Sequence, residues 1–397
     1  MSTDALPRIV LKPGRHTPVR GRHPWLHDSA VGRVENGPAD GDEVDVCSSD
    51  GRWLARGLYN SHSRIRVRLY TWNSEERIDD AFWRRRLEAA ADLRLGLGYD
   101  TPAGAARLVY SEGDGLSGLI IDRYAGHLVV QPTALALSRR MDSLVPLLQE
   151  IWSPESITLR ADQAMLRREG YEAVEGPIVG TPPEVVFIEE HGVKYGVPLA
   201  GQKTGWYLDQ RENRLAAAHW LRGRRVLDVC CYGGGFALAA VMVGGATEVL
   251  GVDTSAAAVA LARANAELSS AHQATFEIGD CFDDLAMRLK RGERYGGVVL
   301  DPPKFSRGRG GVATALRAYH HLNQLAVQLL EPGGILVTCS CSGSVRREDF
   351  FATLQGVAVK TGRELQLLEQ RGASPDHPIP ATCAETEYLK CFVCRVL

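Results

Sequence analysis

The stretch Val226-Leu-Asp-Val-Cys-Cys-Tyr-Gly-Gly-Gly-Phe236 is an apolar strand that runs directly into a glycine turn. Acidic residues then follow at intervals of one strand and one helix, at Asp253, Asp280 and Asp301. An open α/β sheet holds its ligand at the carboxyl ends of its strands, and acidic residues at those ends suit a nucleoside-bearing ligand. The chain is therefore predicted to be an α/β protein with a Rossmann-like, doubly wound, mostly parallel sheet that binds such a ligand.

Near-continuous apolar runs after about residue 193 support this sheet, because strands covered on both faces are apolar throughout. The predicted strands are Arg225–Val229, Glu248–Asp253, Thr275–Gly279, Val298–Asp301 and Ile335–Ser340. A closing run at Leu389–Val396 suits a last, antiparallel strand. Helices are expected between the strands, including Ser255–Leu268 with Ser255 as its N-cap.

The upstream sequence predicts two further domains. Short β-branched runs broken by Gly, Pro and Asp are typical of a small β-barrel, and they lie at Ile9–Leu11, Gly32–Val34, Glu43–Cys47, Trp53–Tyr59 and Ile65–Leu69. A helical run at Ile78–Leu97 leads into a region of mixed strands and helices. We assign residues 1–75 to an N-terminal barrel, 76–190 to a central α/β domain and 191–397 to the domain of the doubly wound sheet.

The composition is that of an ordinary globular protein, with 45% hydrophobic and 24% charged residues and a net charge of -2. No apolar run of about 18 residues is present, and the first residues lack the layout of a signal peptide, so a cytoplasmic protein without a membrane partner is expected. The 9 cysteines are scattered, and the pair Cys391 and Cys394 has no second pair at zinc spacing. Reduced thiols and no metal site are therefore expected.

The glycine turn carries the first candidate ligand contacts. Gly233-Gly-Gly235 lets backbone N–H groups approach a ligand that a side chain would block. Asp253 follows about 20 residues later, where a carboxylate accepts hydrogen bonds from ribose hydroxyls, and Asp280 is placed to reach an adenine amino group. The turn departs from the dinucleotide pattern G-x-G-x-x-G at Leu238, which disfavours a nicotinamide oxidoreductase.

Asp301-Pro-Pro-Lys-Phe305 and the nearby cysteines form the predicted reaction end. The two prolines fix φ, which holds Asp301 and the flanking carbonyls toward a planar base. A thiolate that adds to carbon 6 of cytosine turns carbon 5 into a nucleophile able to take a methyl group. Cys341 is the predicted nucleophile, because Cys339 is expected to pack in the sheet. Lys304 is predicted to lower the pKa of that thiol from the usual value of about 8.5.

Four motifs, in this order, resemble those of one family. They are Leu108-Val-Tyr-Ser-Glu-Gly-Asp-Gly-Leu116 with Gly118-Leu-Ile-Ile-Asp-Arg-Tyr124, Gly201-Gln-Lys-Thr-Gly-Trp-Tyr-Leu-Asp-Gln-Arg211, Asp301-Pro-Pro-Lys-Phe305 and Ser340-Cys-Ser-Gly343. Essentially the whole chain is similar to the PUA-domain 23S rRNA (cytosine-5) methyltransferases of the RlmI type. The resemblance implies an RNA-binding PUA-like barrel, a central α/β domain and a class I methyltransferase domain. It also implies S-adenosylmethionine as cofactor, S-adenosylhomocysteine as product and Cys341 as the one catalytic cysteine.

The chemistry and the resemblance together give three groups of candidate residues. Catalytic roles are assigned to Cys341, Asp301 and Lys304. Cofactor contacts are assigned to Asp228, Tyr232, Gly233, Gly235, Phe236, Asp253, Asp280, Asp301, Pro302, Gln210 and Arg211. Contacts with RNA are assigned to Lys12, Arg15, Arg22, Trp25, Arg64, Arg66 and Lys203, since cationic side chains hold phosphates.

Several alternatives stay open at the level of sequence. A guanine amino or ring-nitrogen methyltransferase would use the same scaffold without a thiol, and a non-catalytic RNA-binding assembly factor would use only its surface. The expected partner is 23S rRNA or a large-subunit precursor, with a homodimer left open. The sequence does not identify the modified nucleotide, the choice between naked rRNA and an assembled particle, or the group that removes the carbon 5 proton.

Overall fold

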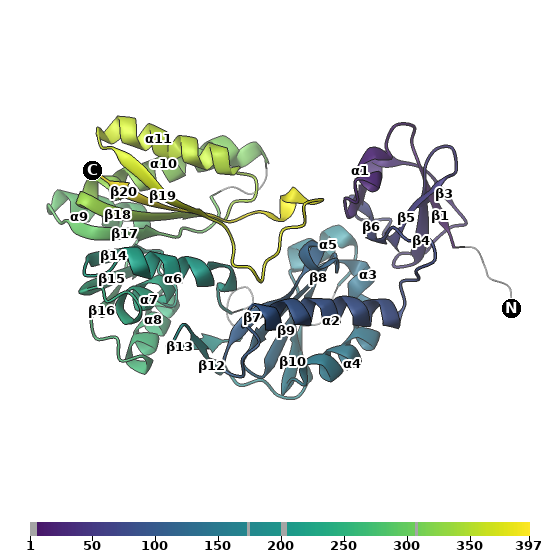
Figure 1. The fold of residues 1–397 in the computed structure, drawn as a ribbon, viewed down its shortest axis with the longest axis horizontal. Helices are drawn as coiled ribbons and strands as arrows, with labels where there is room; N and C mark the ends of the chain where they lie inside the picture. The colour runs from purple at the N-terminus through teal and green to yellow at the C-terminus, as the bar shows by residue number, and fades with distance from the viewer. Residues whose placement is uncertain (1–5, 173–174, 200–204, 306–308) are drawn as a thin grey trace. The chain divides into compact units, whose positions relative to one another are not determined.

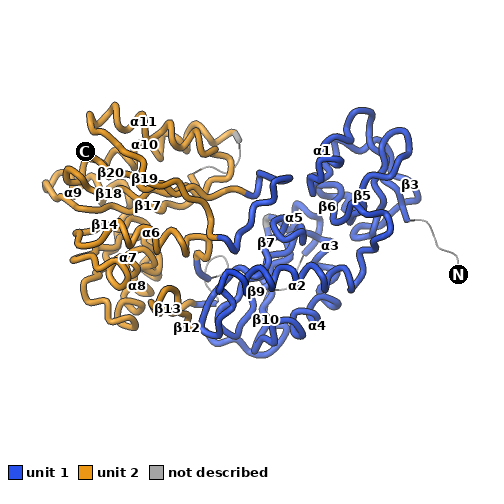
Figure 2. The backbone as a smooth tube through the Cα atoms, in the orientation of Figure 1, with its two compact units in different colours: residues 1–186, 198–206, 375–386 blue, residues 187–197, 207–374, 387–397 orange. Residues whose placement is uncertain are grey.

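The computed structural model describes residues 6–172, 175–199, 205–305 and 309–397. The chain folds into two compact units (Figure 2). Unit 1 comprises Met1–Val186, Pro198–Trp206 and Pro375–Thr386, and unit 2 comprises Phe187–Val197, Tyr207–Ser374 and Glu387–Leu397. Each unit is thus built from segments that lie far apart in the sequence. The domain boundaries expected at residues 75 and 190 stay predictions.

The N-terminal part of unit 1 is a six-stranded sheet in the order β2-β6-β5-β4-β1-β3. Its elements are β1 (Arg8–Leu11), α1 (Thr17–Arg20), β2 (Trp25–His27), η1 (Asp28–Ala30), β3 (Val31–Glu35), β4 (Glu43–Cys47), β5 (Trp53–Tyr59) and β6 (Ile65–Thr71). Alternate β-branched side chains such as Val44 and Val46 fill its core. The strands expected from the sequence are confirmed, except that β2, of three residues, is missed.

The central part of unit 1 is a five-stranded sheet in the order β11-β10-β9-β8-β7 with helices beside it (Figure 1). Its elements are α2 (Asp80–Gly96), β7 (Ala105–Tyr110), η2 (Ser111–Asp114), β8 (Leu119–Tyr124), β9 (His127–Pro132), α3 (Leu135–Ser138), α4 (Met141–Trp152), β10 (Ser156–Leu159), α5 (Gln163–Glu169) and β11 (Gly176–Val179). Helix α2 begins where the Asp79 carboxylate accepts a hydrogen bond from the backbone N–H of Phe82, at 2.9 Å. The helix predicted near residues 78–97 is confirmed.

Buried ion pairs join the barrel strands of unit 1 to its central part. Arg68 on β6 lies 3.2 Å from Glu112 and 3.5 Å from Glu169. The indole N–H of Trp25 donates to the same Glu112 carboxylate at 2.8 Å. Because a buried charge that loses its partner is strongly destabilising, these contacts fix the barrel against the central sheet. Glu112, which belongs to the first family motif, therefore has a structural role.

Strands β12 (Val185–Glu190) and β13 (Val193–Pro198) form a two-stranded sheet. The backbone N–H of Gly196 donates to Asn265 at 2.7 Å, and the hydroxyl of buried Tyr195 donates to the carbonyl of Gly235 at 3.4 Å. These bonds attach β13 to unit 2. The predicted boundary at residue 190 coincides with the end of β12.

Unit 2 is a doubly wound sheet of seven strands in the order β16-β15-β14-β17-β18-β20-β19. The strands are β14 (Arg225–Val229), β15 (Glu248–Asp253), β16 (Ala274–Ile278), β17 (Tyr295–Leu300), β18 (Leu330–Ser340), β19 (Leu365–Arg371) and β20 (Lys390–Val396). The first five are parallel, and β20 is antiparallel to both β18 and β19. The mostly parallel sheet and the antiparallel last strand are confirmed, whereas β19 is not predicted by the sequence.

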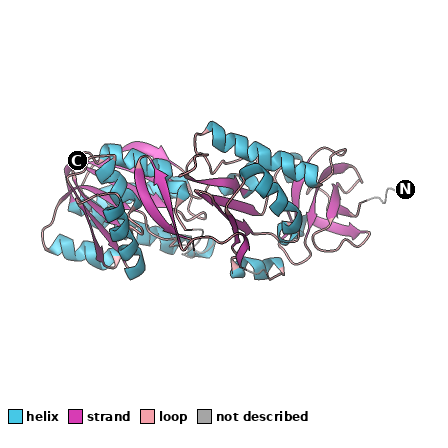
Figure 3. Cartoon of the chain, turned by 90° about the horizontal axis from the view of Figure 1, so that it is seen from below, coloured by secondary structure: helices cyan, strands magenta, loops and turns pink. Residues whose placement is uncertain are grey.

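Helices cover both faces of the unit 2 sheet (Figure 3). They are α6 (Arg211–Trp220), α7 (Gly235–Met242), α8 (Ala256–Leu268), α9 (Cys281–Lys290), α10 (Val312–Leu329) and α11 (Arg347–Thr361), with short turns η3 (Leu208–Gln210), η4 (Arg309–Gly311) and η5 (Ala384–Thr386, in unit 1). α8 begins as predicted at Ser255, whose hydroxyl accepts from the N–H of Ala258 at 3.2 Å. The crossovers leave the carboxyl ends of β14, β15, β17 and β18 at one edge.

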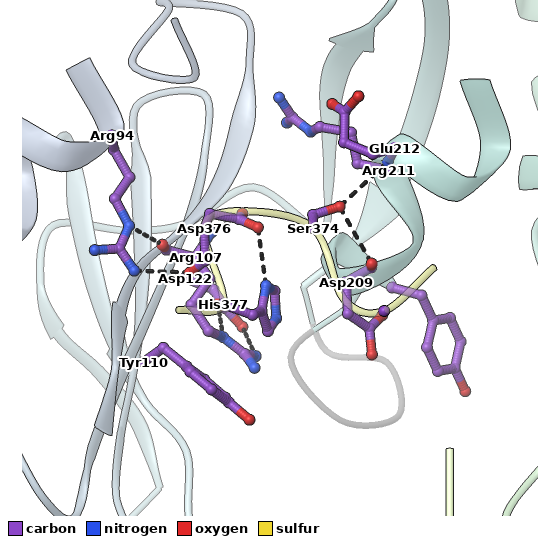
Figure 4. A network of polar contacts seen from close by, with 12 residues as sticks. Arg94, Arg107, Tyr110, Asp122, Asp209, Arg211, Glu212, Ser374, Asp376 and His377 are labelled. Atoms are coloured by element: carbon purple, nitrogen blue, oxygen red, sulfur yellow. Dashed lines mark hydrogen bonds and ion pairs between the residues drawn. The ribbon is translucent and has the colours of Figure 1, made fainter. Parts of the chain in front are cut away.

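Between β19 and β20 the chain leaves unit 2 and packs into unit 1. There the guanidinium of Arg94, from α2, is fully buried and donates to the carbonyl of Asp376 at 2.7 Å and to the carbonyl of Arg107 at 2.7 Å (Figure 4). It also forms a two-pronged ion pair with Asp114. The Asp376 carboxylate accepts from the N–H of Arg107 at 2.9 Å. One buried arginine thus joins α2 and the neighbouring β7–η2 region to a segment 282 positions further along the chain.

No helix among the described residues is both long and apolar enough to cross a lipid bilayer. The cytoplasmic location and the homodimer stay predictions.

Candidate active site

The turn after β14 adopts a backbone that few residues tolerate. Cys230, Tyr232 and Gly234 have φ values of 63°, 48° and 82°. A Cβ on Gly234 would lie 3.1 Å from the ring of Phe276 and 3.3 Å from the side chain of Ala262, so a side chain there would be both strained and crowded. The turn places the N-terminus of α7 at the carboxyl edge of the sheet, as expected for a ligand-binding loop.

Asp253 ties this turn to the end of β15. One carboxylate oxygen accepts from the backbone N–H of Tyr232 at 3.0 Å, and the other accepts from the N–H of Ser255 at 2.9 Å. Each carboxylate oxygen has a second lone pair with which it can accept a further hydrogen bond. The contact with ribose hydroxyls stays a prediction, and the structure adds a positioning role.

Asp228, the last but one residue of β14, is buried below the turn. Its Oδ2 accepts from the backbone N–H of Ala237 on α7 at 3.0 Å, while Oδ1 has no hydrogen-bond partner among the described residues. Burial, with smaller contributions from the nearby carboxylates of Asp301 and Asp253, raises the pKa of Asp228 to about 8 despite the opposing effect of the bond from Ala237. A buried oxygen without a partner is rare and suits a ligand that brings a donor or a positive charge.

Replacing Asp228 by asparagine is expected to increase the stability of the ligand-free protein at alkaline pH. The folded protein holds the Asp228 proton more tightly than the unfolded chain does, because the ordinary pKa is 3.8 and the folded one about 8. This contribution is fully present below about pH 4 and is lost as the pH rises through about 8. The advantage of Asp228→Asn, measured by urea unfolding, should grow by more than about 1 kcal/mol between pH 5 and pH 8.

The control for that measurement is Asp280→Asn, since Asp280 is exposed. If the free energies of unfolding of the wild type and Asp228→Asn change in parallel with pH, the Asp228 carboxyl ionises in the folded protein without a cost in stability. Asp280 itself caps α9, because its Oδ1 accepts from the N–H groups of Phe282 at 2.9 Å and Asp283 at 3.2 Å. Its contact with adenine stays a prediction.

The half-buried Asp301 follows β17 and is oriented by a chain of amides. Buried Gln210 donates from Nε2 to Asp301 Oδ1 at 3.0 Å, and Asn213 donates to Gln210 Oε1 at 2.6 Å. Arg211 is also buried, and its Nε lies 3.9 Å from Glu190. Gln210 therefore acts directly on the predicted catalytic carboxylate, whereas Arg211 lies against a structural one. The cofactor contacts of both residues stay predictions.

Cys341 lies just beyond β18, half-buried, and its thiol donates to the carbonyl of Pro302 at 3.8 Å. The structure thus brings together Cys341 and the Asp301-Pro-Pro turn. Cys339 is fully buried opposite Cys391, and burial raises the pKa of its thiol, which confirms that it packs in the sheet. Lys304 is exposed, with Nζ 5.9 Å from the ring of Tyr388. Its effect on the thiol stays a prediction.

The sequence interpretation missed Lys390, the first residue of β20. Its side chain is 2% exposed, and Nζ donates to the carbonyls of Ser342 at 2.7 Å and Tyr388 at 2.8 Å. Burial lowers the pKa of this ammonium group to about 8, and Cys341 acts on it in the opposite direction. The signal in the sequence was a lysine at the head of an otherwise apolar closing strand.

The candidate RNA contacts fall into three groups in the structure. The first group consists of Arg15, Arg22 and Arg64, which are exposed. Exposed arginines suit contacts with phosphates best. Lys12 donates to the carbonyl of Ser29 at 3.0 Å, Arg66 donates to that of Asn60 at 3.1 Å, and Trp25 donates to Glu112. Lys203 lies outside the described residues. All of these RNA contacts stay predictions.

Among the described residues, unit 1 contains one group of potential metal ligands. Side-chain atoms of His23, Cys383 and Glu385 lie within 4.8 Å of one another. The N–H of Trp25 donates to His23 Nδ1 at 3.1 Å, which places the ring proton on Nε2, 3.4 Å from the Glu385 carboxylate. Burial raises the pKa of the Cys383 thiol to about 12. These residues form a hydrogen-bonded group in which a metal would have to displace the protons of the ring and the thiol, and the absence of a metal site stays a prediction.

Comparisons with known proteins cover the whole chain. Residues 9–72 match a family described as a PUA-like domain, and residues 151–389 match one described as S-adenosylmethionine-dependent methyltransferase. The chain is 41% identical over 394 residues to Ribosomal RNA large subunit methyltransferase I of Escherichia coli (strain K12), covering 98% of this chain and 99% of the relative. It is 40% identical over 400 residues to the protein of that name from Klebsiella pneumoniae (strain 342), covering 100% of both.

Solved structures show the same fold at low identity. A methyltransferase named SMU.776, in complex with S-adenosylhomocysteine, has a TM-score of 0.84 and 19% identity over 98% of this chain and 99% of that one. A second S-adenosylmethionine-dependent methyltransferase structure, from Streptococcus mutans, has a TM-score of 0.82, also at 19% identity, over 98% and 99% of the two chains. The fold therefore extends over the full length of the chain.

Fold and site together define an S-adenosylmethionine-dependent class I methyltransferase that carries an N-terminal PUA-like β domain. The chain belongs to the family of Ribosomal RNA large subunit methyltransferase I. The fold class and the cofactor expected from the sequence are thereby confirmed. The site suits the cofactor. S-adenosylmethionine carries a sulfonium and an ammonium group, and a positively charged group is a suitable partner for the buried Oδ1 of Asp228, which has no hydrogen-bond partner among the described residues.

Proposed function

We propose that the protein methylates carbon 5 of a cytosine in large-subunit ribosomal RNA, 23S rRNA or its precursor, with Cys341 as nucleophile. Relatives named Ribosomal RNA large subunit methyltransferase I support the RNA substrate. The PUA-like barrel with its exposed arginines supports contacts with phosphates. S-adenosylmethionine supplies an electrophilic methyl group when bound.

The position of Cys341 is the observation that carries the choice of cytosine. The thiol is half-buried at the carboxyl edge of the sheet, against the Pro302 carbonyl and beside the turn that presents Asp301. Methylation of an amino group or a ring nitrogen requires no thiol, because those nitrogens carry their own electron pair. Carbon 5 of cytosine does require one.

The chain's residues would act in sequence on a base turned out of its stack. The Cys341 thiolate forms a bond to carbon 6, and the displaced electron pair makes carbon 5 nucleophilic. Carbon 5 gains the methyl group, then loses its proton to a base, and elimination breaks the sulfur–carbon bond and returns the thiolate. Asp301, oriented by Gln210, would hydrogen-bond the cytosine during these steps.

Mass spectrometry of RNA nucleosides tests the proposal. Purified full-length protein is incubated with S-adenosylmethionine and either 23S rRNA or large-subunit particles from cells that lack the protein. The expected product is 5-methylcytidine. Methylguanosine as the product would establish the alternative guanine chemistry. Absence of any methylated nucleoside with both substrates, from protein that binds S-adenosylmethionine, would favour a non-catalytic RNA-binding factor.

A further inference from the structure

Lys390 occupies an unusual position for a charged side chain. It opens β20 and is paired with Ser340 on antiparallel β18, one residue before Cys341. The side chain is 2% exposed, and lysines are almost never this deeply buried without a partner. An ammonium group removed from water is costly unless an opposite charge or hydrogen bonds compensate it. Its partners therefore indicate what it does.

The two hydrogen bonds of Lys390 go to neutral groups. Nζ donates to the carbonyls of Ser342 and Tyr388, at 2.7 Å and 2.8 Å, which satisfies two of the three N–H groups of an ammonium. Among the described residues, no carboxylate forms an ion pair with it. Because Ser342 follows Cys341 directly, the bond to its carbonyl holds the amine beside the backbone of the cysteine.

Two acidic groups, Cys341 and Glu387, favour the charged form of Lys390. After burial, Cys341 is the strongest influence on the pKa of Lys390 and the first one that favours the charged form. The other charges acting on Lys390 are Arg347, Glu387 and Lys304. Among the groups that interact with Cys341 are Tyr207 and Tyr319, and Asp301 acts on the same two tyrosines.

We propose that Lys390 is the buried counter-ion that holds Cys341 as a thiolate, an inference that rests on the proposed role of Cys341. With Lys390 present as an ammonium group, the S–H bond of Cys341 breaks, the proton passes to water, and an ammonium–thiolate pair replaces an ammonium–thiol pair while both Lys390 hydrogen bonds are kept. The thiol's weak bond to the Pro302 carbonyl is given up in this exchange. Lys390 acts through the cysteine and is a positioning residue.

Lys304, the lysine expected from the sequence to serve this purpose, is less suited to it. Lys304 is exposed, so water and salt screen its charge, whereas an ion pair that excludes water is much stronger. Lys390 is in addition fixed by two carbonyls, one of which belongs to Ser342, the residue after Cys341.

Alkylation of Cys341 by iodoacetamide tests the pair without RNA or cofactor. The rate is measured between pH 5.5 and 9.5 by mass spectrometry of the Cys341 peptide, for the wild type, Lys390→Met, Lys390→Arg and Lys304→Met. We expect the midpoint of the wild-type profile to lie below pH 7.5. Lys390→Met should raise it by at least about one unit, a tenfold slower reaction at pH 7, because only the thiolate reacts. Lys390→Arg, which retains the charge, should restore most of the reactivity.

Two outcomes would overturn the proposal. If the wild type and a folded Lys390→Met have the same midpoint, Lys390 does not stabilise the thiolate. If the midpoint rises only in Lys304→Met, Lys304 has that role instead. If Lys390→Met does not fold, as judged by circular dichroism, a wild-type midpoint above pH 8.5 would still reject the pair. A low midpoint together with methylguanosine as the reaction product would refute the cytosine proposal and leave the ion pair standing.

Discussion

Cys341→Ala is expected to lower the rate of RNA methylation by at least about a thousand-fold while the affinity for S-adenosylmethionine stays within a few-fold. Removal of a nucleophile eliminates the covalent route, and losses of this size or larger are typical. The glycine turn, Asp228 and Asp253 do not depend on the thiol, so cofactor binding should persist. Single-turnover methylation and calorimetric titration of the cofactor measure the two quantities separately.

Cys339→Ala is the matched control, because it removes a sulfur from the same strand. Cys339 is fully buried, lies opposite Cys391 and interacts through its thiol with Gln210, so its loss should lower methylation far less than the loss of the nucleophile does. Methyl transfer retained by Cys341→Ala would reject the nucleophile. A loss of activity in Cys339→Ala but not in Cys341→Ala would move the role to the deeper cysteine.

Arg94→Met is expected to destabilise unit 1 by about 3–5 kcal/mol. Methionine fills a similar volume but leaves the Asp114 carboxylate, 4% exposed at its side chain, without its partner. It also removes the hydrogen bonds that Arg94 donates to the carbonyls of Arg107 and Asp376. Because Asp376 belongs to the segment between β19 and β20, that segment should become more susceptible to proteases in the variant.

The control for this substitution lies on the same helix. Arg85 pairs with Glu76 at 2.8 Å, but its side chain is 56% exposed, and exposed pairs contribute only about 0–1 kcal/mol. Urea unfolding, followed by tryptophan fluorescence and by limited proteolysis after residue 371, compares Arg85→Met with Arg94→Met. Equal stabilities of the two variants would show that the buried network contributes no more than a surface pair.

The periodicity of apolar residues and the positions of turn-forming residues in the sequence predict much of the fold. Apolar runs at Arg225–Val229 and Glu248–Asp253 have the same bounds as β14 and β15, because a buried parallel strand is recognisable from its own residues. β2 and β19 were missed, since a three-residue strand and a partly exposed edge strand carry no such signal. Asp280 illustrates the limit for a site: its position at a strand end was predicted, but its role as the cap of α9 was not.

The sequence by itself determined the order of strands and helices, the glycine turn and the residue types that line the carboxyl edge, because these depend on neighbours along the chain. Only the tertiary structure decided which side chains meet. Gln210 reaches Asp301 across 91 positions, and Lys390 reaches the residue after Cys341 across 48. Those contacts depend on the pairing of β18 with β20 and on the placement of η3, which arise from packing between distant segments and leave no local pattern in the sequence.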